Sequence, residues 1–335
     1  MKAIAPGKLI LSGEHAVVFG RPALAMAIDR SAQSIITATP GDLVSFNLVD
    51  FQSTDSFTLR ALRDMRQRVL RNYRLFLDGE LGIRDVLYKP VELFEYMFIN
   101  LLDGLHLKLN EGLSIQTRSD IPIGCGLGSS AATVLSAARA VGHYFRVDFR
   151  PDWYYRYSME AEKLQHGYPS GVDSYIAVHG GCALFRQGAA TSVPLPRFNL
   201  YLVNTGTPEA TTGECVASVR ERHEHDPIWN DFEAVTLGLE AAIRANDMDA
   251  IRAHIRENNR LLTRIGVVPE KVARFIASVE QRGGAAKVCG AGSVRGEHGG
   301  MVLVVDDQPP TKLCQDYGYI LTSVRGDPLG TRIID

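Results

Sequence analysis

The sequence predicts an α/β protein with two domains. The chain opens on short apolar runs separated by turn residues, and it continues with helical patterns that alternate with further strand-like runs. A length of 335 residues suffices for two domains. The stretch RQGAATSVPLPRFN near residue 190 contains Pro and Gly, which favour a loop and hence a boundary between domains. We therefore expect one domain over residues 1–190 and a second over 191–335.

The elements of the expected first domain follow from apolar periodicity. Strand character is expected in IAPGKLILSG, AVVFGRPALAMAI, SIITATPGDLVSFNLVDF, GLSIQTRSDIP and GGCALF, where apolar runs are bounded by turn residues. Helices are expected over 59–76, 93–105, 129–145 and 152–166. In the first two of these helices, apolar side chains recur at steps of three or four residues, which indicates a face packed on the core.

The expected second domain has the same mixed character. FNLYLVNTG and GMVLVVDD are typical of strands, the second of them buried. Helical patterns cover residues 232–243, 248–262 and 269–282. The chain shows no internal repeat and no low-complexity linker.

Composition and charge exclude several classes of protein. A net charge of −2 gives no electrostatic reason to expect nucleic acid or an anionic membrane as the main partner. No apolar run approaches the roughly 20 residues that span a bilayer, and the N-terminal apolar stretch is interrupted by Pro6, Gly7 and Lys8, unlike a signal peptide. The five cysteines are scattered without a C-x-x-C pair, which disfavours a zinc site or a disulfide framework. We expect a cytoplasmic protein with reduced thiols.

A glycine-rich loop is the first candidate site. In SDIPIGCGLGSSAA, three glycines run directly into two serines and a small-residue helix. Glycine lets backbone N–H groups approach an anion, and the N-terminus of a helix carries a partial positive charge. The spacing matches neither the P-loop nor the dinucleotide-binding pattern. Two readings therefore stay open at this point: a phosphate cradle, or a tight strand-to-helix turn with a serine cap.

Three segments carry a resemblance to a known family. APGKLILSGEHAVVFGRPALA, GCGLGSSAA and KVCGAGS resemble, in this order, the three motifs of the GHMP kinase superfamily, and EKLQHGYPSGVDS resembles the substrate motif of its mevalonate kinases. The resemblance covers residues 5 to about 300. It implies an N-terminal domain like domain 2 of ribosomal protein S5, a ferredoxin-like C-terminal domain, and ATP, Mg²⁺ and mevalonate bound in the cleft between them. It also allows a homodimer, although the sequence does not determine the oligomeric state.

The resemblance implies two catalytic residues. Asp173 matches the aspartate that accepts the proton of the substrate hydroxyl, and Lys8 matches the lysine beside it. A cation at that place offsets the charge that develops on the transferred phosphoryl group. From the residues alone, Asp173 is equally well explained as a helix cap and Lys8 as a solvated lysine at a strand end.

The resemblance also implies an ATP site and a metal pair. Glu162 lies eleven residues before Asp173 and shares Mg²⁺ with Ser130, whereas Glu160 points elsewhere. An ion pair between Glu162 and His166, four residues apart on one helix face, is the alternative. The ATP-binding residues are expected at Ser119, Gly124, Gly126, Leu127, Gly128, Ser129 and Ser130.

Substrate-binding positions complete the set. Glu14, His15, Arg186 and Thr205 match positions near the substrate, beside Lys8 and Asp173. The guanidinium of Arg186 suits a carboxylate. For His15 and Thr205, a structural role is the ordinary alternative.

The chain departs from the family pattern in its third motif. SVRGEH separates Gly292 from Gly299, which lengthens this loop by roughly five residues over 293–298, and Ser174 replaces the asparagine that often follows the aspartate. Besides mevalonate phosphorylation, two functions stay open: a GHMP kinase for phosphomevalonate or a sugar, and a catalytically silent ATP-binding sensor.

Overall fold

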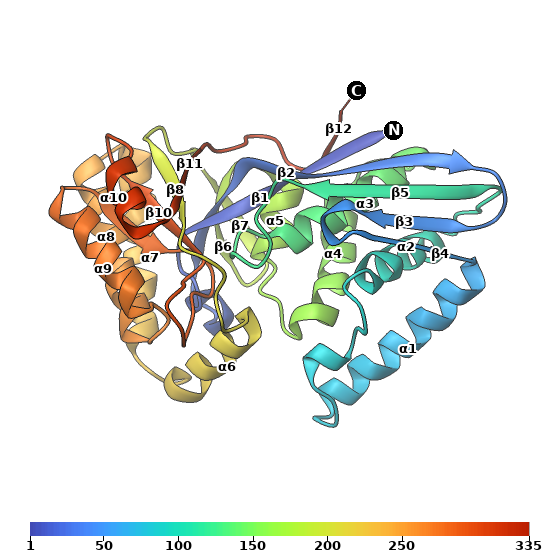
Figure 1. Ribbon diagram of the computed structural model, residues 1–335, viewed down its shortest axis with the longest axis horizontal. Coiled ribbons are helices and arrows are strands. Elements are labelled where there is room, and N and C mark those ends of the chain that lie inside the picture. Colours follow the sequence, from blue (N-terminus) through green and yellow to red (C-terminus); the bar gives the residue numbers. More distant parts are fainter. Residues whose placement is uncertain (335) are drawn as a thin grey trace.

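The computed structural model describes residues 1–334, and it consists of two β-sheets with helices packed on them (Figure 1). The strands of the first sheet are β1 Lys2–Ser12, β2 Ala23–Thr39, β3 Val44–Leu48, β4 Ser53–Phe57, β5 Gly112–Ser119, β6 Cys182–Arg186, β7 Ala189–Val193 and β12 Arg332–Ile334. Their order is β12-β1-β2-β5-β3-β4, and β6 pairs with both β2 and β7. The long strand β2 can serve two neighbours because its start pairs with β6 and its end pairs with β5.

The helices of this half pack on the sheet or on one another. They are α1 Leu59–Leu77, α2 Glu92–Gly104, α3 Ser129–Tyr144, α4 Pro151–His166 and α5 Val172–His179, with short 3₁₀ turns η1 Ala16–Phe19, η2 Val49–Phe51 and η3 Ile83–Asp85. The four helices expected in this half are confirmed within one residue at each end. Helix α3 packs closely on β1 and β2, because its buried face consists largely of alanines.

The second sheet has four antiparallel strands, β8 Leu200–Asn204, β9 Ala285–Val288, β10 Met301–Val305 and β11 Ile320–Val324. Its order is β11-β8-β10-β9. Numbered along the chain this is fourth, first, third, second, with helices between the first and second strands and between the third and fourth. That is the ferredoxin-like arrangement, as expected.

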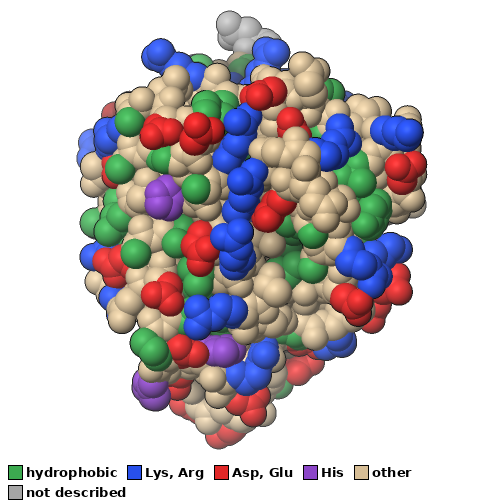
Figure 2. Space-filling model, turned by 90° about the vertical axis from the view of Figure 1, so that its left-hand side faces the viewer, with side chains coloured by type: hydrophobic (Ala, Val, Ile, Leu, Met, Phe, Trp, Pro, Cys, Tyr) green, Lys and Arg blue, Asp and Glu red, His purple; other side chains and the backbone are tan. Residues whose placement is uncertain are grey.

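The helices of this half are α6 Thr212–His223, α7 Ile228–Ala245, α8 Met248–Arg264, α9 Glu270–Gln281 and α10 Thr311–Tyr317. The three expected helices are confirmed, although α7 begins four residues earlier than its periodicity indicated. Helices α6 and α10 and strand β9 were not expected from the sequence. The surface on this side of the molecule mixes signs of charge, since basic side chains in Figure 2 are bordered by acidic ones.

The chain returns to the first sheet after β11. Strand β12 pairs with β1, and just before it Thr331 donates two hydrogen bonds to the carbonyl of Ala177 in α5, from its N–H at 2.9 Å and its hydroxyl at 2.8 Å. A Cβ at Gly330 would lie 2.0 Å from the carbonyl oxygen of Val178, so only glycine fits there. Strand β7 also spans residue 190. The division into domains 1–190 and 191–335 therefore stays a prediction. The first sheet crosses this boundary, because it includes β12 from the second part of the chain.

Two further properties concern the whole described chain. All five cysteines are buried and free. Within residues 1–334, no helix combines the length and the apolar character that crossing a bilayer requires.

Candidate active site

Lys8 and Asp173 come from distant segments and form an ion pair. The Nζ of Lys8 lies 2.9 Å from Oδ1 of Asp173; the lysine side chain is 5% exposed and the aspartate side chain 32%. Lys8 belongs to β1, at a point where the register with β2 shifts, and such irregularities re-aim side chains. Asp173 is the second residue of α5, whose N-cap is Gly171 in the left-handed conformation. The expected pairing is therefore present, and Asp173 is not the helix cap.

The glycine-rich loop closes over this pair. A Cβ at Gly128 would lie 2.9 Å from Cγ of Lys8 and 3.5 Å from Oδ2 of Asp173, so the missing side chain is what lets the three residues meet. The loop is also tied to β1 by the backbone, because the N–H of Lys8 donates to the carbonyl of Leu127 at 2.9 Å. The side chain of Leu127 itself is buried in the core.

The start of α3 differs from the serine-capped turn that was the alternative reading. Gly124, Gly126 and Gly128 have φ of 72°, 78° and 71°, which L-residues rarely adopt. The N-cap is Gly128, and Ser129 and Ser130 are the first two helical residues. No side chain caps the helix, so its first N–H groups point into the loop without an intrahelical partner. This arrangement suits an anion.

Glu162 is buried, and its carboxyl interacts electrostatically with both Asp173 and Lys8. Glu162 lies in α4 and is 3% exposed. Its burial is the main cause, and the negative charge of Asp173 the second cause, of the rise in the pKa of its carboxyl to about 8. Hydrogen bonding to Ser174 and the charge of Lys8 act in the opposite direction. Among the ion pairs of residues 1–334, none joins Glu162 to His166. Glu160 lies exposed on the other side of the helix and pairs with Lys163 at 2.6 Å.

Ser130 contacts a residue that the sequence did not single out. Its hydroxyl donates to Oε1 of Gln165 at 2.6 Å, which joins the start of α3 to the end of α4. Gln165 stands directly before the HGYPSGVD segment. An uncharged side chain at a helix end gave no chemical signal by itself.

Glu14 and His15 follow β1, and both are buried. Glu14 forms an ion pair with Lys287 of β9, and its second oxygen accepts from Nδ2 of Asn258 at 3.2 Å. His15 has φ of 57°, and its Nε2 lies 3.1 Å from the carbonyl oxygen of Ala291. Burial lowers the pKa of His15 to about 4, so the ring is neutral, with Nε2–H as the donor.

Lys287 and its neighbours form a polar network that the sequence did not predict. Ser12 bonds to Thr236 at 2.7 Å and donates to Asn258 at 3.0 Å, and Asn258 in turn donates to Glu14. The only sequence signal for Lys287 is a lysine inside the otherwise apolar run AAKVC. Because all these side chains are buried, the network holds the end of β1 against α7, α8 and β9.

Two expected residues have other partners. Arg186, at the end of β6, forms an ion pair with Glu233 of α7, which also pairs with Arg21 at 2.8 Å. Ser119 lies at the end of β5, and its backbone N–H donates to the carboxylate of Asp50 at 2.7 Å. The hydroxyl of Ser119 accepts from the N–H of Ile121 at 3.1 Å. These contacts do not bring either residue to Lys8 or Asp173.

Thr205 fastens the third motif. Its hydroxyl donates to the carbonyl of Gly300 at 2.8 Å and accepts from the N–H of Gly299 at 3.0 Å, while its own carbonyl faces His298. The third motif contacts the glycine-rich loop, because a Cβ at Gly290 would lie 2.8 Å from Cα of Gly126. Thr205 thus has the structural contacts that were its alternative role.

The extra loop residues 293–298 pack on the second domain. Arg295 donates to the carbonyl of Glu209 at 3.0 Å and pairs with Glu214 at 3.3 Å. Glu214 belongs to the capping box of α6 and also pairs with Arg84 of the first domain at 3.1 Å. The longer loop is therefore held by the start of α6, and through Glu214 it joins a contact between the two domains.

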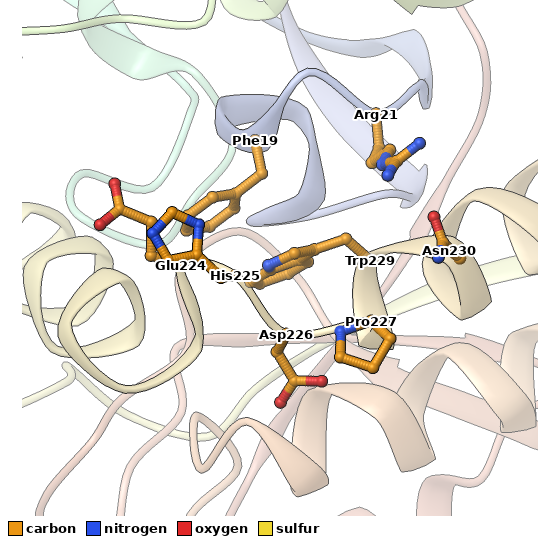
Figure 3. Close-up of a pocket in the computed structure, with 8 residues that line it drawn as sticks. All are labelled: Phe19, Arg21, Glu224, His225, Asp226, Pro227, Trp229 and Asn230. Carbon is orange, nitrogen blue, oxygen red and sulfur yellow. The ribbon is translucent and has the colours of Figure 1, made fainter.

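A separate pocket of about 390 Å³ lies beside the turn between α6 and α7 (Figure 3). It is lined by Phe19, Arg21, Glu224, His225, Asp226, Pro227, Trp229 and Asn230. Phe19 stacks on Trp229, with 4.1 Å between the ring centroids, and Asp226 already accepts from Ile228 and pairs with His223. None of the expected site residues lines this pocket.

Comparison with known proteins identifies related domains and a related enzyme. Residues 92–181 match the GHMP kinases N terminal domain, and residues 239–294 match the GHMP kinases C terminal domain. A mevalonate kinase of Archaeoglobus fulgidus is 31% identical over 297 residues, which cover 87% of this chain and 89% of that protein.

Solved structures show the same fold. The Methanococcus jannaschii mevalonate kinase superposes with a TM-score of 0.80 at 23% identity, covering 98% of each chain. An L. major mevalonate kinase in complex with R-mevalonate gives a TM-score of 0.69 at 20% identity, covering 98% of this chain and 97% of that one. By its identity to the Archaeoglobus protein over most of both lengths, the chain belongs to the mevalonate kinase family within the GHMP kinases.

Proposed function

We propose that the protein is an ATP-dependent kinase that phosphorylates the 5-hydroxyl of mevalonate, giving 5-phosphomevalonate and ADP. One observation carries the proposal: the ion pair of Lys8 and Asp173 lies against Gly128, at the open start of α3. An acceptor carboxylate, a cation and a phosphate-binding backbone are thereby within one side chain's length of each other. The mevalonate kinases among the relatives support the substrate. The intact pair opposes the alternative of a catalytically silent sensor.

ATP binds through the glycine-rich loop in this proposal. The three left-handed glycines turn backbone N–H groups toward the start of α3, where the helix dipole favours negative charge. Phosphoryl transfer needs mainly positioning and neutralisation of charge, and a rigid backbone cradle supplies the first of these. Ser129 and Gly128 contribute through their main-chain groups.

Asp173 and Lys8 act on the acceptor hydroxyl. Asp173 orients it and takes its proton late in the transfer, because a carboxylate is a weak base. Its partial exposure leaves room for a substrate hydroxyl beside the lysine. Lys8 offsets the charge that develops on the phosphoryl oxygens.

Ser130 and Glu162 suit Mg²⁺. They offer only oxygen atoms, which are the ligands Mg²⁺ prefers, and Mg²⁺ commonly takes one or two protein oxygens while phosphates and water complete its shell. The raised pKa of Glu162 indicates a buried carboxyl short of positive charge, which a divalent cation supplies. Within residues 1–334, no cluster of three or more His, Cys, Asp or Glu could hold a metal by itself. When bound, the ion neutralises charge on the phosphates.

Besides Lys8 and Asp173, His15 is the expected substrate-binding residue that, within residues 1–334, still has an unpartnered polar atom. Its Nε2–H donates to the carbonyl of Ala291, and its Nδ1 is buried with no hydrogen-bond partner among the described residues. A substrate hydroxyl would donate to Nδ1 only once the residues that cover it move aside. Arg186 would first have to leave Glu233 before it could meet a substrate carboxylate. Glu14 and Thr205 have their polar atoms engaged within the protein.

A coupled ADP-release assay tests the proposal. The assay compares mevalonate, phosphomevalonate, homoserine and galactose, each with Mg-ATP. We expect the highest kcat/KM with mevalonate. A higher value for phosphomevalonate or a sugar, with mevalonate inert, would falsify the substrate assignment.

A further inference from the structure

Among the described residues, Gln165 makes the one side-chain hydrogen bond of Ser130. The Ser130 hydroxyl donates to Oε1 of Gln165 at 2.6 Å, and the two residues belong to different helices. A serine hydroxyl has one proton and two lone pairs, and the acceptor that takes the proton decides where the lone pairs point. The orientation of Ser130 is therefore set from α4.

Glu162 shares this helix face. Glu162 and Gln165 are three residues apart in α4, and residues at this spacing are neighbours on a helix surface. Gln165 is exposed and contacts the start of α3 through Ser130, whereas Glu162 is buried and hydrogen-bonds to Ser174. Because the amide takes the proton of Ser130, both lone pairs of the Ser130 hydroxyl stay free to bind a metal ion.

A metal ligand must present a lone pair and not a proton. A neutral hydroxyl that binds Mg²⁺ has to turn its O–H away from the ion, and this costs less when an acceptor already waits there. Groups that orient metal ligands in this way typically change metal affinity 10- to 100-fold when they are removed.

We propose that Gln165 is a positioning residue for the magnesium site: its amide oxygen takes the hydroxyl proton of Ser130 and so presents the lone pairs of Ser130 to Mg²⁺. This inference rests on the proposed function, and in particular on Ser130 as a metal ligand. Gln165 itself does not touch the ion or the substrate.

The test measures ATP binding by calorimetry without mevalonate, with saturating Mg²⁺ and with EDTA. The quantity compared is the ratio of the two dissociation constants, which reports the gain in ATP affinity due to Mg²⁺. Gln165→Met removes the acceptor at nearly constant length. We expect it to reduce this ratio about 10-fold and to leave the EDTA value within about twofold.

Three companion variants make the result specific. Gln165→Glu can only accept hydrogen bonds, so it keeps the orientation of Ser130 and should retain the Mg²⁺ gain. In a Ser130→Ala background, Gln165→Met should have no further effect, because its partner is already absent. Gln281→Met is the matched control, since Gln281 is an exposed glutamine at the end of α9.

The outcomes separate the inference from the proposed function. If the unaltered protein shows no Mg²⁺ gain, the metal site itself is wrong, and the inference is overturned with it. If that gain is present but Gln165→Met preserves it, or weakens ATP equally in EDTA, only the role of Gln165 is refuted. An undiminished effect of Gln165→Met in the Ser130→Ala background refutes it as well.

Discussion

Strand β1 and the turn after it supply two lysine–carboxylate pairs with opposite environments. In the first, Lys8 meets Asp173, whose side chain is 32% exposed. In the second, Glu14 meets Lys287, and both side chains are at most 1% exposed. Lys287 also donates to the carbonyl of Ile10 at 3.1 Å, and Glu14 is also held by Asn258.

The difference lies in the spare capacity of the carboxylate. Both oxygens of Glu14 have protein donors, so nothing else can bind there without breaking the network. Asp173 is open to the loop that would carry phosphate, and a substrate hydroxyl can reach it. A lysine–carboxylate pair thus suits the proposed catalysis where its carboxylate is open to solvent, and it suits cohesion where the carboxylate is sealed in the protein.

The largest expected effect belongs to the open pair. Asp173→Asn should lower kcat by roughly 10²–10⁴, as general-base loss does, with ATP affinity and thermal unfolding little changed. Lys8→Met should also lower kcat, and the double variant should be little worse than the poorer single one if the two act together. Steady-state kinetics and ATP calorimetry check this. Near-normal turnover by folded Asp173→Asn would remove Asp173 as the base.

The sealed pair should show the reverse. Lys287→Met leaves a buried carboxylate without its cation, which typically costs about 3–5 kcal/mol of the free energy of unfolding. The double variant Glu14→Gln, Lys287→Met should recover most of that loss, because neither charge is then buried alone. Urea unfolding measures both, with Lys312→Met as an exposed-lysine control. A single variant as stable as the control would show that the pair contributes no cohesion.

Another buried carboxylate, that of Glu95, forms no ion pair among the described residues. Glu95 in α2 is 2% exposed, and its Oε1 has no hydrogen-bond partner among the described residues. Burial, with the charges of Glu92 and Asp55, raises its pKa from 4.5 to about 7, against the weaker effects of Lys89 and Arg68. Between pH 4.5 and about 7, Glu95 is therefore mostly protonated in the folded protein and mostly ionised in the unfolded chain.

The sign of the resulting pH dependence is fixed. The contribution of the protonated Glu95 is fully present below pH 4.5 and is lost as pH rises toward about 7. Glu95→Gln imitates the protonated form, so its advantage over the unaltered protein should grow through this window, by at most about 3 kcal/mol. Urea unfolding at pH 5, 6, 7 and 8 measures the difference. Parallel stability curves for the two proteins would contradict the assignment.

Periodicity predicted most helices, but it failed for particular reasons. Helix α6 buries only Cys215 and Val219, so its apolar stripe is too thin to recognise. Its start did carry a signal, since Thr211 and Glu214 form a capping box. Strand β9 is only four residues long and contains a lysine, which hides it among turn residues.

The site was predictable to the extent that the motifs carried it. The meeting of Lys8, Asp173 and Gly128 follows from resemblance, because their segments are far apart in the sequence. The partner of Glu14 could not be inferred, since Lys287 is 273 residues away and no local pattern joins them. The contact of Ser130 with Gln165 depends on the relative placement of two helices, which sequence spacing does not express.

The return of the chain after β11 has a consequence for synthesis on the ribosome. Helix α5, which carries Asp173, is braced by Gly330 and Thr331, and β1, which carries Lys8, gains β12 as an edge neighbour. Translation reaches these residues only after the whole second sheet has been made. A nascent chain therefore lacks the brace of the Lys8–Asp173 pair until the ferredoxin-like half has emerged, so the two residues are not expected to take their final places in a chain that stops before Gly330.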